Sequence, residues 1–457
     1  MMDKDHPDRP KLVEEVLGTI TENNIKYAQL EFTDIHGILK SVNISAKRLE
    51  DAIHNGQNFD GSSITGYGNI EESDMVAFPD PTTFVILPGR DSKKAPKKRV
   101  CRFLSDIYNP DRTRYIGDPR YILQRQIDAA KEMGLEYFCS PELEFFLLAE
   151  GEGGSKSPPV ASDMRGYFDY DPGGEDERIR REIADTAEYF GIEIEMLHHE
   201  VALSQHEVDI KYGPVSTQAD TTVTMKVIMK IVAALHNRIA TFMPKPFAGV
   251  NGSGMHCHQS LWRDGANTFY DENDPNNISE TMRQFIAGQL SHGREMSAVL
   301  ASWPNSYKRL VPGFEAPVYI AWGFKNRSPL IRVPDFGGRP NSARCEIRCP
   351  DPAGNPYLQF AVLLAAGLDG IRNQLEAPPA TDLNVYHLSF KERKKMGIVS
   401  LPGSLGEAMT VFEASPLMLE VFGEHPFKNF LYAKEDENDL FRASVSNWEF
   451  DRYVRKL

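Results

Sequence analysis

Hydrophobic and polar positions alternate along the first hundred or so residues. Tyr27-Ala-Gln-Leu-Glu-Phe has a period of two, which is typical of a half-buried strand. Asp34-Ile-His-Gly-Ile-Leu-Lys follows it with the pattern of a turn into a second strand, and Gly37 supplies the permissive backbone. We expect this region to consist of short strands and turns, with a solvated basic loop at 91–99.

Helical spacing begins at Asp118-Pro119, an N-cap residue followed by proline at the first helical position, and Gly134 is placed to end that helix. Apolar stripes predict two further helices, from about 176 to 190 and from about 217 to 242. Strand-like stretches lie between and after them. The order predicts an α+β protein with a small β-rich domain, 1–112, and a larger mixed domain, 117–457.

Composition narrows the class of protein. The 457 residues are 41% apolar and 25% charged, as in ordinary globular proteins. The net charge of −14 does not favour binding to nucleic acid or to an anionic membrane. No apolar run approaches the roughly 18–20 residues of a spanning helix, and the start has no secretory signal pattern. Five cysteines cannot form a closed set of disulfides, so we expect a cytoplasmic protein.

Acidic side chains recur in pairs in the strand-like stretches. Glu142 and Glu144 are two residues apart, so they share one face of a strand. Burying two like charges is costly unless a cation lies between them, and one such pair alone is better explained as a solvated face. The pattern recurs at Glu200 and Glu207, which flank a short turn that a hairpin could close.

Two later segments carry similar sets. Alternation puts the polar residues of each on one face: His256, His258 and Ser260 in the first, and Arg344, Glu346 and Arg348 in the second. Cys345 and Cys349 fall on the opposite face and are predicted to fill the core. Five carboxylates and one histidine form an oxygen-rich set that suits Mg²⁺ or Mn²⁺ better than Zn²⁺, and more than one ion is needed to neutralise them.

Arginines gather in a segment broken by prolines. Arg309, Arg327 and Arg332 lie within 303–334, which is too interrupted for a regular helix or strand and is interpreted as a shaped loop. Planar guanidinium groups suit carboxylates and phosphates. The sequence has no phosphate-binding loop of the G-x-x-x-x-G-K-[ST] type, so arginines and metal ions would hold any phosphate. Two divalent ions beside clustered arginines are typical of phosphoryl transfer.

Together these segments resemble a known family. The matching motifs are Phe-Asp60-Gly-Ser-Ser, Pro-Glu142-Leu-Glu144-Phe-Phe, His-Glu200-Val-Ala, Gln-His-Glu207, Asn251-Gly-Ser-Gly-Met-His256, Asn305-Ser-Tyr-Lys-Arg309-Leu-Val-Pro-Gly-Phe-Glu315-Ala-Pro, Asn326-Arg327-Ser and Arg344-Cys-Glu346-Ile-Arg348. They resemble bacterial and archaeal type I glutamine synthetases, in the shorter α-type subgroup. The resemblance runs from about residue 15 to the C-terminus, with the motifs in the family's order.

The resemblance implies a fold, an activity and an assembly. The fold would be an N-terminal β-grasp domain followed by a catalytic domain with a curved antiparallel sheet and flanking helices. The activity would be ATP-dependent ligation of ammonia to L-glutamate through γ-glutamyl phosphate. Two or more Mg²⁺ ions per subunit are implied, with Mn²⁺ as the alternative. The assembly would be a dodecamer of two stacked hexameric rings, with active sites between neighbouring subunits.

The resemblance also assigns residues, position by position. Glu144, Glu200 and Glu207 would hold one metal ion, and Glu142, His256 and Glu346 the other. The glutamate site would comprise Asn251, Gly252, Arg309, Glu315 and Arg348. The ATP site would comprise Glu195, Tyr212, His258, Ser260, Arg327, Arg332 and Arg344. Asp60 of the adjacent subunit would deprotonate ammonium, Arg327 would contact the transferring phosphate, and Glu315 would close over the site.

Alternatives and regulation stay open at this point. A γ-glutamyl ligase for a polyamine or other amine would share the fold, and a silent relative could serve as a structural or regulatory partner. Asn69 stands where α-type enzymes usually have an arginine tied to feedback inhibition by glutamine. The context of Tyr386 predicts no adenylylation. A 2-oxoglutarate site or a site for a regulatory protein cannot be located from the sequence.

Overall fold

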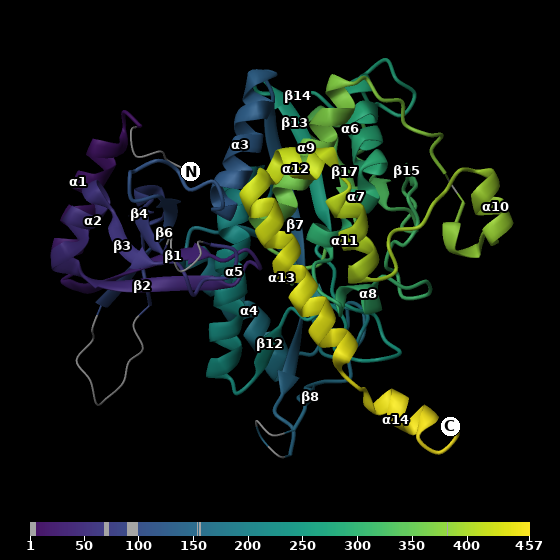
Figure 1. Ribbon diagram of the computed structural model, residues 1–457, viewed down its shortest axis with the longest axis horizontal. Helices are drawn as coiled ribbons and strands as arrows, with labels where there is room; N and C mark the ends of the chain where they lie inside the picture. The colour runs from purple at the N-terminus through teal and green to yellow at the C-terminus, as the bar shows by residue number, and fades with distance from the viewer. Residues whose placement is uncertain (1–5, 68–72, 89–98, 153, 155–156, 382) are drawn as a thin grey trace.

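The computed structural model describes residues 6–67, 73–88, 99–152, 154, 157–381 and 383–457. A small N-terminal part lies beside a much larger part that holds the rest of the chain (Figure 1). Within the described residues, no helix is both long enough and apolar enough to cross a membrane.

The N-terminal part is built on a six-stranded sheet with the order β2-β1-β6-β4-β3, and β5 also pairs with β6. The strands are β1 Ile25–Thr33, β2 Leu39–Ser45, β3 Gln57–Asp60, β4 Asp74–Pro79, β5 Val85–Ile86 and β6 Arg99–Tyr108. The predicted hairpin is confirmed, because β1 and β2 pair antiparallel. Gly37 in its turn has a φ of 83°, and a Cβ there would lie 2.6 Å from the Cα of Asn355 in the larger part.

Two helices in this part were not expected from the sequence. They are α1 Arg9–Glu22 and α2 Leu49–Asn55, so the expectation of strands and turns alone was wrong. Val13, Val16 and Ile20 of α1 are buried at helical spacing, but a stripe of so few apolar residues is a weak signal in a polar segment. Nearly all of the predicted basic loop, 91–99, falls outside the described residues.

The larger part contains a second, mainly antiparallel sheet of eleven strands, which confirms the predicted α+β fold class. Its main order is β15-β16-β17-β13-β7-β10-β9, and among the strands that the described residues form in this sheet only the β15/β16 pair is parallel. The strands are β7 Glu136–Ala149, β8 Val160–Ala161, β9 Ile194–His199, β10 Gln205–Ile210, β11 Gly213–Pro214, β12 Ile239–Thr241, β13 Cys257–Arg263, β14 Ala266–Asn267, β15 Trp322–Phe324, β16 Ile331–Val333 and β17 Cys345–Ile347.

Helices surround this sheet, and α10 and α14 project away from the body (Figure 1). Their bounds are α3 Pro119–Glu132, α4 Glu175–Tyr189, α5 Val215–Leu235, α6 Glu280–Ser291, α7 Gly293–Leu300, α8 Ser306–Arg309, α9 Pro356–Arg372, α10 Phe390–Lys395, α11 Leu405–Glu413, α12 Pro416–Phe422, α13 Glu424–Ala443 and α14 Asn447–Tyr453. Asp118 caps α3 as predicted, accepting the N–H of Arg120.

The predicted helix over 217–242 ends earlier, at Leu235. Asn237 adopts a φ of 55°, which breaks the helix, and β12 begins at Ile239. Three polar residues, His236, Asn237 and Arg238, interrupt the apolar stripe where the helix ends, and the apolar residues from Ile239 onwards belong to the strand. The segment over 303–334 is irregular as predicted, apart from the single turn of α8 and the three-residue strands β15 and β16.

A buried ion network joins the two parts. The guanidinium of Arg120 on α3 donates to Asp106 at 2.7 Å and to Asp80 at 2.8 Å, both in the N-terminal part. It also contacts Asp220 on α5 at 2.8 Å. This network fixes how the N-terminal part sits against α3 and α5. The domain boundary between residues 112 and 117 stays a prediction.

Candidate active site

The central strands bring the predicted carboxylates together through their register. In the antiparallel pair of β7 and β10, Glu144 lies opposite Glu207, and Glu142 lies opposite Asp209. On the other side of β7, β13 begins one residue after His256 and pairs with β17, which carries Glu346. The two glutamates of β7 therefore each have an acidic residue of β10 as their cross-strand neighbour, on the same face of the sheet.

One group of metal-ligand side chains comprises Glu142, His256 and Glu346, with ligand atoms within 4.8 Å of one another. The Nδ1 atom of His256 lies 3.0 Å from Glu142 Oε2 and 3.7 Å from Glu346 Oε1. Glu346 is almost fully buried. The three residues are those that the family resemblance implies for one metal ion.

A second group comprises His198, Glu200 and Glu207, again within 4.8 Å. Glu144 lies opposite Glu207 in the paired strands β7 and β10, and its Oε1 atom also lies 3.8 Å from Nε2 of His256 in the first group. Its Oε2 atom accepts hydrogen bonds from the Gln205 side chain and the Gly254 N–H. Two of the carboxylates that the resemblance implies for the other ion, Glu200 and Glu207, lie in this group with a histidine that was not predicted, and the third, Glu144, lies on the neighbouring strand.

Burial and mutual repulsion raise the pKa of several of these carboxyl groups. Burial, helped by the charge of Glu200, raises the pKa of Glu144 to about 8. Burial and the neighbouring carboxylates raise the pKa of Glu207 well above its usual value. For Glu142, burial is outweighed by His258 and His256, which together lower its pKa. A divalent cation would relieve the repulsion that favours protonation, so this donor set fits hard cations.

These groups line a cavity of about 210 Å³, here called the carboxylate cavity. Its walls also contain the other residues predicted for glutamate and the transferring phosphate, namely Asn251, Gly252, Arg309, Glu315, Arg327 and Arg348. The Asn251 amide donates to Glu315 at 3.3 Å, and Glu315 has a φ of 55°. A Cβ on Gly252 would lie 2.2 Å from the carbonyl oxygen of Pro244, so only glycine fits.

A second cavity of about 550 Å³ adjoins the first and is here called the arginine cavity. It is lined by all the residues predicted for ATP except Arg327: Glu195, Tyr212, His258, Ser260, Arg332 and Arg344. The two cavities share Glu142, Met196, Asp209 and Arg332. A ligand in the arginine cavity could therefore extend a charged end towards the metal-ligand groups.

The arginines differ in what they contact. Arg332 and Arg348 both donate to Glu346, the latter at 3.2 Å. Arg309 instead directs its guanidinium to backbone carbonyls, including Cys349 O at 3.0 Å. These bonds give Arg309 a role in shaping the cavity wall that the sequence did not indicate. Arg327 shares the carboxylate cavity with Tyr167, another residue that the sequence did not single out, and the two side chains interact electrostatically.

Among the residues of the carboxylate cavity that the sequence did not single out, three carry titratable side chains: Asp209, His198 and Tyr167. Asp209 continues the two-residue spacing after Glu207, and His198 is two residues before Glu200, so period-two alternation could have found both. Tyr167 has no such signal, because it lies in a loop. Asp209 is buried, and burial together with the Glu142 charge raises its pKa to about 7.

Asp60 lies elsewhere. It ends β3 in the N-terminal part, is exposed, and lines neither cavity of its own chain. Its carboxylate accepts the Ser62 N–H at 2.8 Å. Asn69 falls outside the described residues. Tyr386 is half-buried, with its hydroxyl donating to Ala316 O at 2.8 Å. All five cysteines are free and buried, as predicted for Cys345 and Cys349.

Metal-ligand groups beside an arginine-lined cavity define the class of enzymes that handle phosphates with divalent cations. Residues 116–453 match the family described as glutamine synthetase, catalytic domain, and residues 24–110 match glutamine synthetase, beta-Grasp domain. The chain belongs to the glutamine synthetase family.

Proteins of similar sequence or structure align with nearly the whole chain. Glutamine synthetase of Methanosarcina mazei is 48% identical over 444 residues, covering 97% of this chain and 98% of the relative. That of Clostridium saccharobutylicum is 46% identical over 443 residues, with 97% and 98% covered. Among solved structures, Plasmodium falciparum glutamine synthetase gives a TM-score of 0.85 at 26% identity, covering 97% of this chain and 98% of that one. A GmaS/ADP complex gives 0.85 at 28% identity, with 96% and 99% covered.

Proposed function

We propose that this chain is a glutamate–ammonia ligase, which joins ammonia to L-glutamate at the expense of ATP and yields L-glutamine, ADP and phosphate. The observation that carries the proposal is the junction of the two cavities at Glu142 and Arg332. A nucleotide in the arginine cavity would direct its phosphates towards the carboxylate cavity, where glutamate would lie. Relatives named glutamine synthetase, at 48% identity and below, support the same activity.

The family uses divalent metal ions and ATP, and the side chains present fit such ions. The ligand atoms are mostly carboxylate oxygens, which favours Mg²⁺ or Mn²⁺ over softer metals. We assign Glu142, His256 and Glu346 to one ion, and Glu144, Glu200 and Glu207 to the other. Ions bound there would neutralise the negative charge of the nucleotide phosphates while the phosphoryl group is transferred.

The chain's own residues would then position the two reactants. A carboxylate is a poor electrophile because its leaving group would be oxide. When an oxygen of the glutamate side chain bonds to the γ-phosphorus, the bond from that phosphorus to the ADP oxygen breaks, which gives γ-glutamyl phosphate. Arg327 would stabilise charge on the moving phosphoryl group. Ammonia then attacks the acyl carbon, the bond from that carbon to the phosphate oxygen breaks so that phosphate leaves, and the nitrogen loses one proton to give the neutral amide.

Two residues would serve the ammonia step. Ammonium has no lone pair, so a base must first remove a proton. We assign that role to Asp60 of an adjacent subunit, which is supported by the exposure of Asp60 and its absence from both cavities of its own chain. Glu315 would shield the acyl phosphate from water. Its carboxylate accepts a hydrogen bond from Asn251, and both residues line the carboxylate cavity.

The enzyme is expected to be an oligomer, and we propose the dodecamer of two stacked hexameric rings. Exposed apolar side chains on the projecting helix α14 and the residues after it support burial against another copy: Trp448, Phe450, Val454 and Leu457.

The cysteines bear on the cellular compartment. Five free buried cysteines fit a reducing compartment, so we propose the cytoplasm.

The activity is tested by measuring glutamine and phosphate release with ATP, glutamate, Mg²⁺ and ammonium, with putrescine replacing ammonium in a parallel reaction. We expect glutamine and phosphate in equal amounts, and product only with ammonium. Product from putrescine alone would reassign the acceptor to an amine. No turnover in either reaction, also after addition of 2-oxoglutarate, would favour a regulatory relative.

A shared site predicts complementation between two inactive variants. We expect Asp60→Ala and Glu346→Ala each to be inactive alone, because each removes a group from every site. Mixed oligomers should recover about one active site in four, since each residue is then intact at half of the positions. The measurement is glutamine formation after the variants are dissociated and reassembled together, with each variant reassembled alone as the control. No recovery would contradict a site built from two subunits.

The assignment of the arginine cavity predicts a selective effect on ATP. Arg344→Ala removes a charged donor that lies beside His258 at 3.2 Å. A hydrogen bond to a charged group contributes about 1.5–3 kcal/mol, so KM for ATP should rise about 10- to 100-fold. KM for glutamate should change little. Arg263→Ala is the matched control, because this exposed arginine on β13 donates to the carbonyls of Met133 and Gly134 and lines neither cavity. A larger rise in KM for glutamate than in KM for ATP would contradict the assignment of the arginine cavity to ATP.

A further inference from the structure

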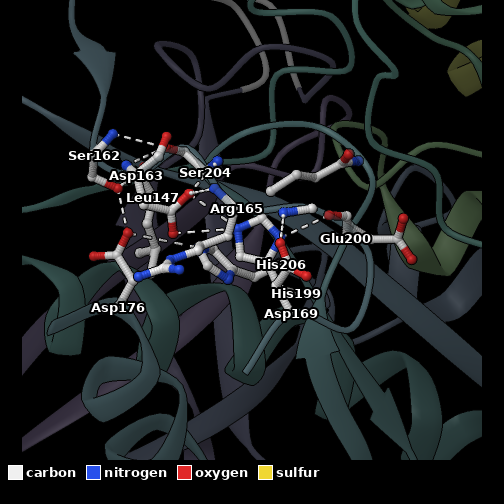
Figure 2. A network of polar contacts seen from close by, with 12 residues as sticks. Leu147, Ser162, Asp163, Arg165, Asp169, Asp176, His199, Glu200, Ser204 and His206 are labelled. Atoms are coloured by element: carbon white, nitrogen blue, oxygen red, sulfur yellow. Dashed lines mark hydrogen bonds and ion pairs between the residues drawn. The ribbon is translucent and has the colours of Figure 1, made fainter. Parts of the chain in front are cut away.

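A second polar cluster lies beside the turn that carries Glu200, and none of its residues has been given a part in catalysis. It centres on Asp163 and includes His199, Ser204 and His206 (Figure 2). Asp163 and His199 are largely buried, and Ser204 and His206 fully so. The cluster lies where β9 turns into β10, and this turn carries Glu200.

The cluster has the spacing of a metal site, but its hydrogen bonds argue against one. The guanidinium of Arg180 donates to Nδ1 of His206 at 2.7 Å, so the hydrogen of this neutral imidazole must be on Nε2. A protonated nitrogen cannot bind a metal ion. Both nitrogens of His199 already contact oxygens, Nδ1 the Glu200 carbonyl at 2.7 Å and Nε2 the Asp163 Oδ1 atom at 3.0 Å, so a metal ion would have to displace one of these hydrogen bonds.

Asp163 instead ties together the two arms of the turn. Its Oδ1 atom accepts from Nε2 of His199 at 3.0 Å and from the N–H of Ser204 at 2.9 Å. Its own N–H donates to the Ser204 hydroxyl at 3.0 Å. Ser204 has a φ of 59°, a left-handed conformation that costs a non-glycine residue about 1 kcal/mol or more. The bonds from Asp163 stabilise this conformation.

From the turn, the contacts continue to the cavity. Nδ1 of His199 donates to the carbonyl oxygen of Glu200 at 2.7 Å, which fixes the backbone that bears this carboxylate. The side chain of Glu200 extends away from Asp163 (Figure 2), towards the carboxylate cavity that it lines. The carbonyl of His199 accepts the N–H of Phe168 at 3.0 Å, which holds the neighbouring Tyr167 at the cavity wall.

We propose that Asp163 and His199 are positioning residues, which hold the turn between β9 and β10 so that the Glu200 carboxylate is preorganised for a divalent cation. The proposal rests on the proposed function, because it takes Glu200 as a metal ligand. Groups that orient a metal ligand commonly change metal affinity or activity by about 10- to 100-fold when they are removed.

The test uses the full-length oligomer and Mn²⁺ as the probe, with binding followed by electron paramagnetic resonance. Asp163→Asn should keep the fold, checked by circular dichroism, and weaken Mn²⁺ binding about 10- to 100-fold. Turnover should fall at low Mn²⁺ and recover at saturating Mn²⁺. A merely structural role would reduce the number of active molecules without changing the Mn²⁺ dissociation constant.

The matched control is Asp171→Asn, the same change at a nearby aspartate that pairs with Arg165 at 3.2 Å on the surface. It should bind Mn²⁺ as the wild type does. His199→Gln decides the matter if Asp163→Asn does not fold. A folded Asp163→Asn or His199→Gln variant with wild-type Mn²⁺ binding would overturn the proposal.

Failure of the proposal and failure of the metal assignment give different results. Glu200→Gln should weaken Mn²⁺ binding directly. If it binds Mn²⁺ as the wild type does, Glu200 is not a ligand, and both the assignment and the positioning role fall. If Glu200→Gln weakens binding but Asp163→Asn does not, the ligand assignment stands and only the positioning role is overturned.

Discussion

Glu346→Ala is expected to reduce glutamine formation by at least about 10²–10³-fold, the loss seen when one preorganised electrostatic group is removed from an active site. Glu346 is almost fully buried, accepts from Arg332 and Arg348, and lies 3.7 Å from His256. Its loss removes one of three proposed ligands of a metal ion and leaves two guanidinium groups without their shared acceptor. The measurements are glutamine formation and the number of Mn²⁺ ions bound per subunit.

The number of ions bound separates a metal role from a general loss of activity. We expect the Glu346→Ala oligomer to assemble normally and to bind one ion fewer per subunit. Glu413→Ala is the control, because Glu413 is exposed at the end of α11 and lines neither cavity. Wild-type activity in Glu346→Ala would contradict the metal assignment.

Arg120→Ala is expected to have the largest effect on stability. Its side chain is buried and pairs with Asp80, Asp106 and Asp220. Without it, three carboxylates of low exposure lose a shared counter-charge, and removing one partner of a buried ion pair typically costs about 3–5 kcal/mol. The free energy of unfolding, measured with a chemical denaturant, should fall by that amount.

A surface pair provides the comparison for Arg120. Lys131 on the same helix lies 4.0 Å from Asp128, and both side chains are more than half exposed. Lys131→Ala should therefore change the free energy of unfolding by at most about 1 kcal/mol. Equal losses in the two variants would show that the network of Arg120 does not hold the two parts together.

Much of the candidate site could be predicted because strands have a fixed period. Two-residue spacing puts Glu142 and Glu144 on one face whatever the rest of the fold does, and the same holds for His256 and His258. Local signals of this kind also gave the cap of α3 at Asp118. The resemblance to a known family then identified residues in irregular segments, such as Glu315 and Arg327, for which no period exists.

Other features depend on contacts between distant residues. The helix α5 ends at Leu235, Asn237 takes a left-handed backbone conformation, and the apolar residues from Ile239 onwards form β12, which pairs with β7 instead of extending the helix. The guanidinium of Arg309 contacts the carbonyls of Cys349 and Pro350, forty residues away. No local pattern records such pairings, since they depend on how the sheet and loops pack.

The sequence by itself therefore determined which residue types share a strand face, and that the set is rich in oxygen ligands. The tertiary structure decided which strands are neighbours, and so which carboxylates meet: Glu144 opposite Glu207, and Glu346 beside His256. It alone linked Asp163 to the turn that carries Glu200. The physical reason is that periodicity is a property of the local backbone, whereas register and burial are set by packing over the whole sheet.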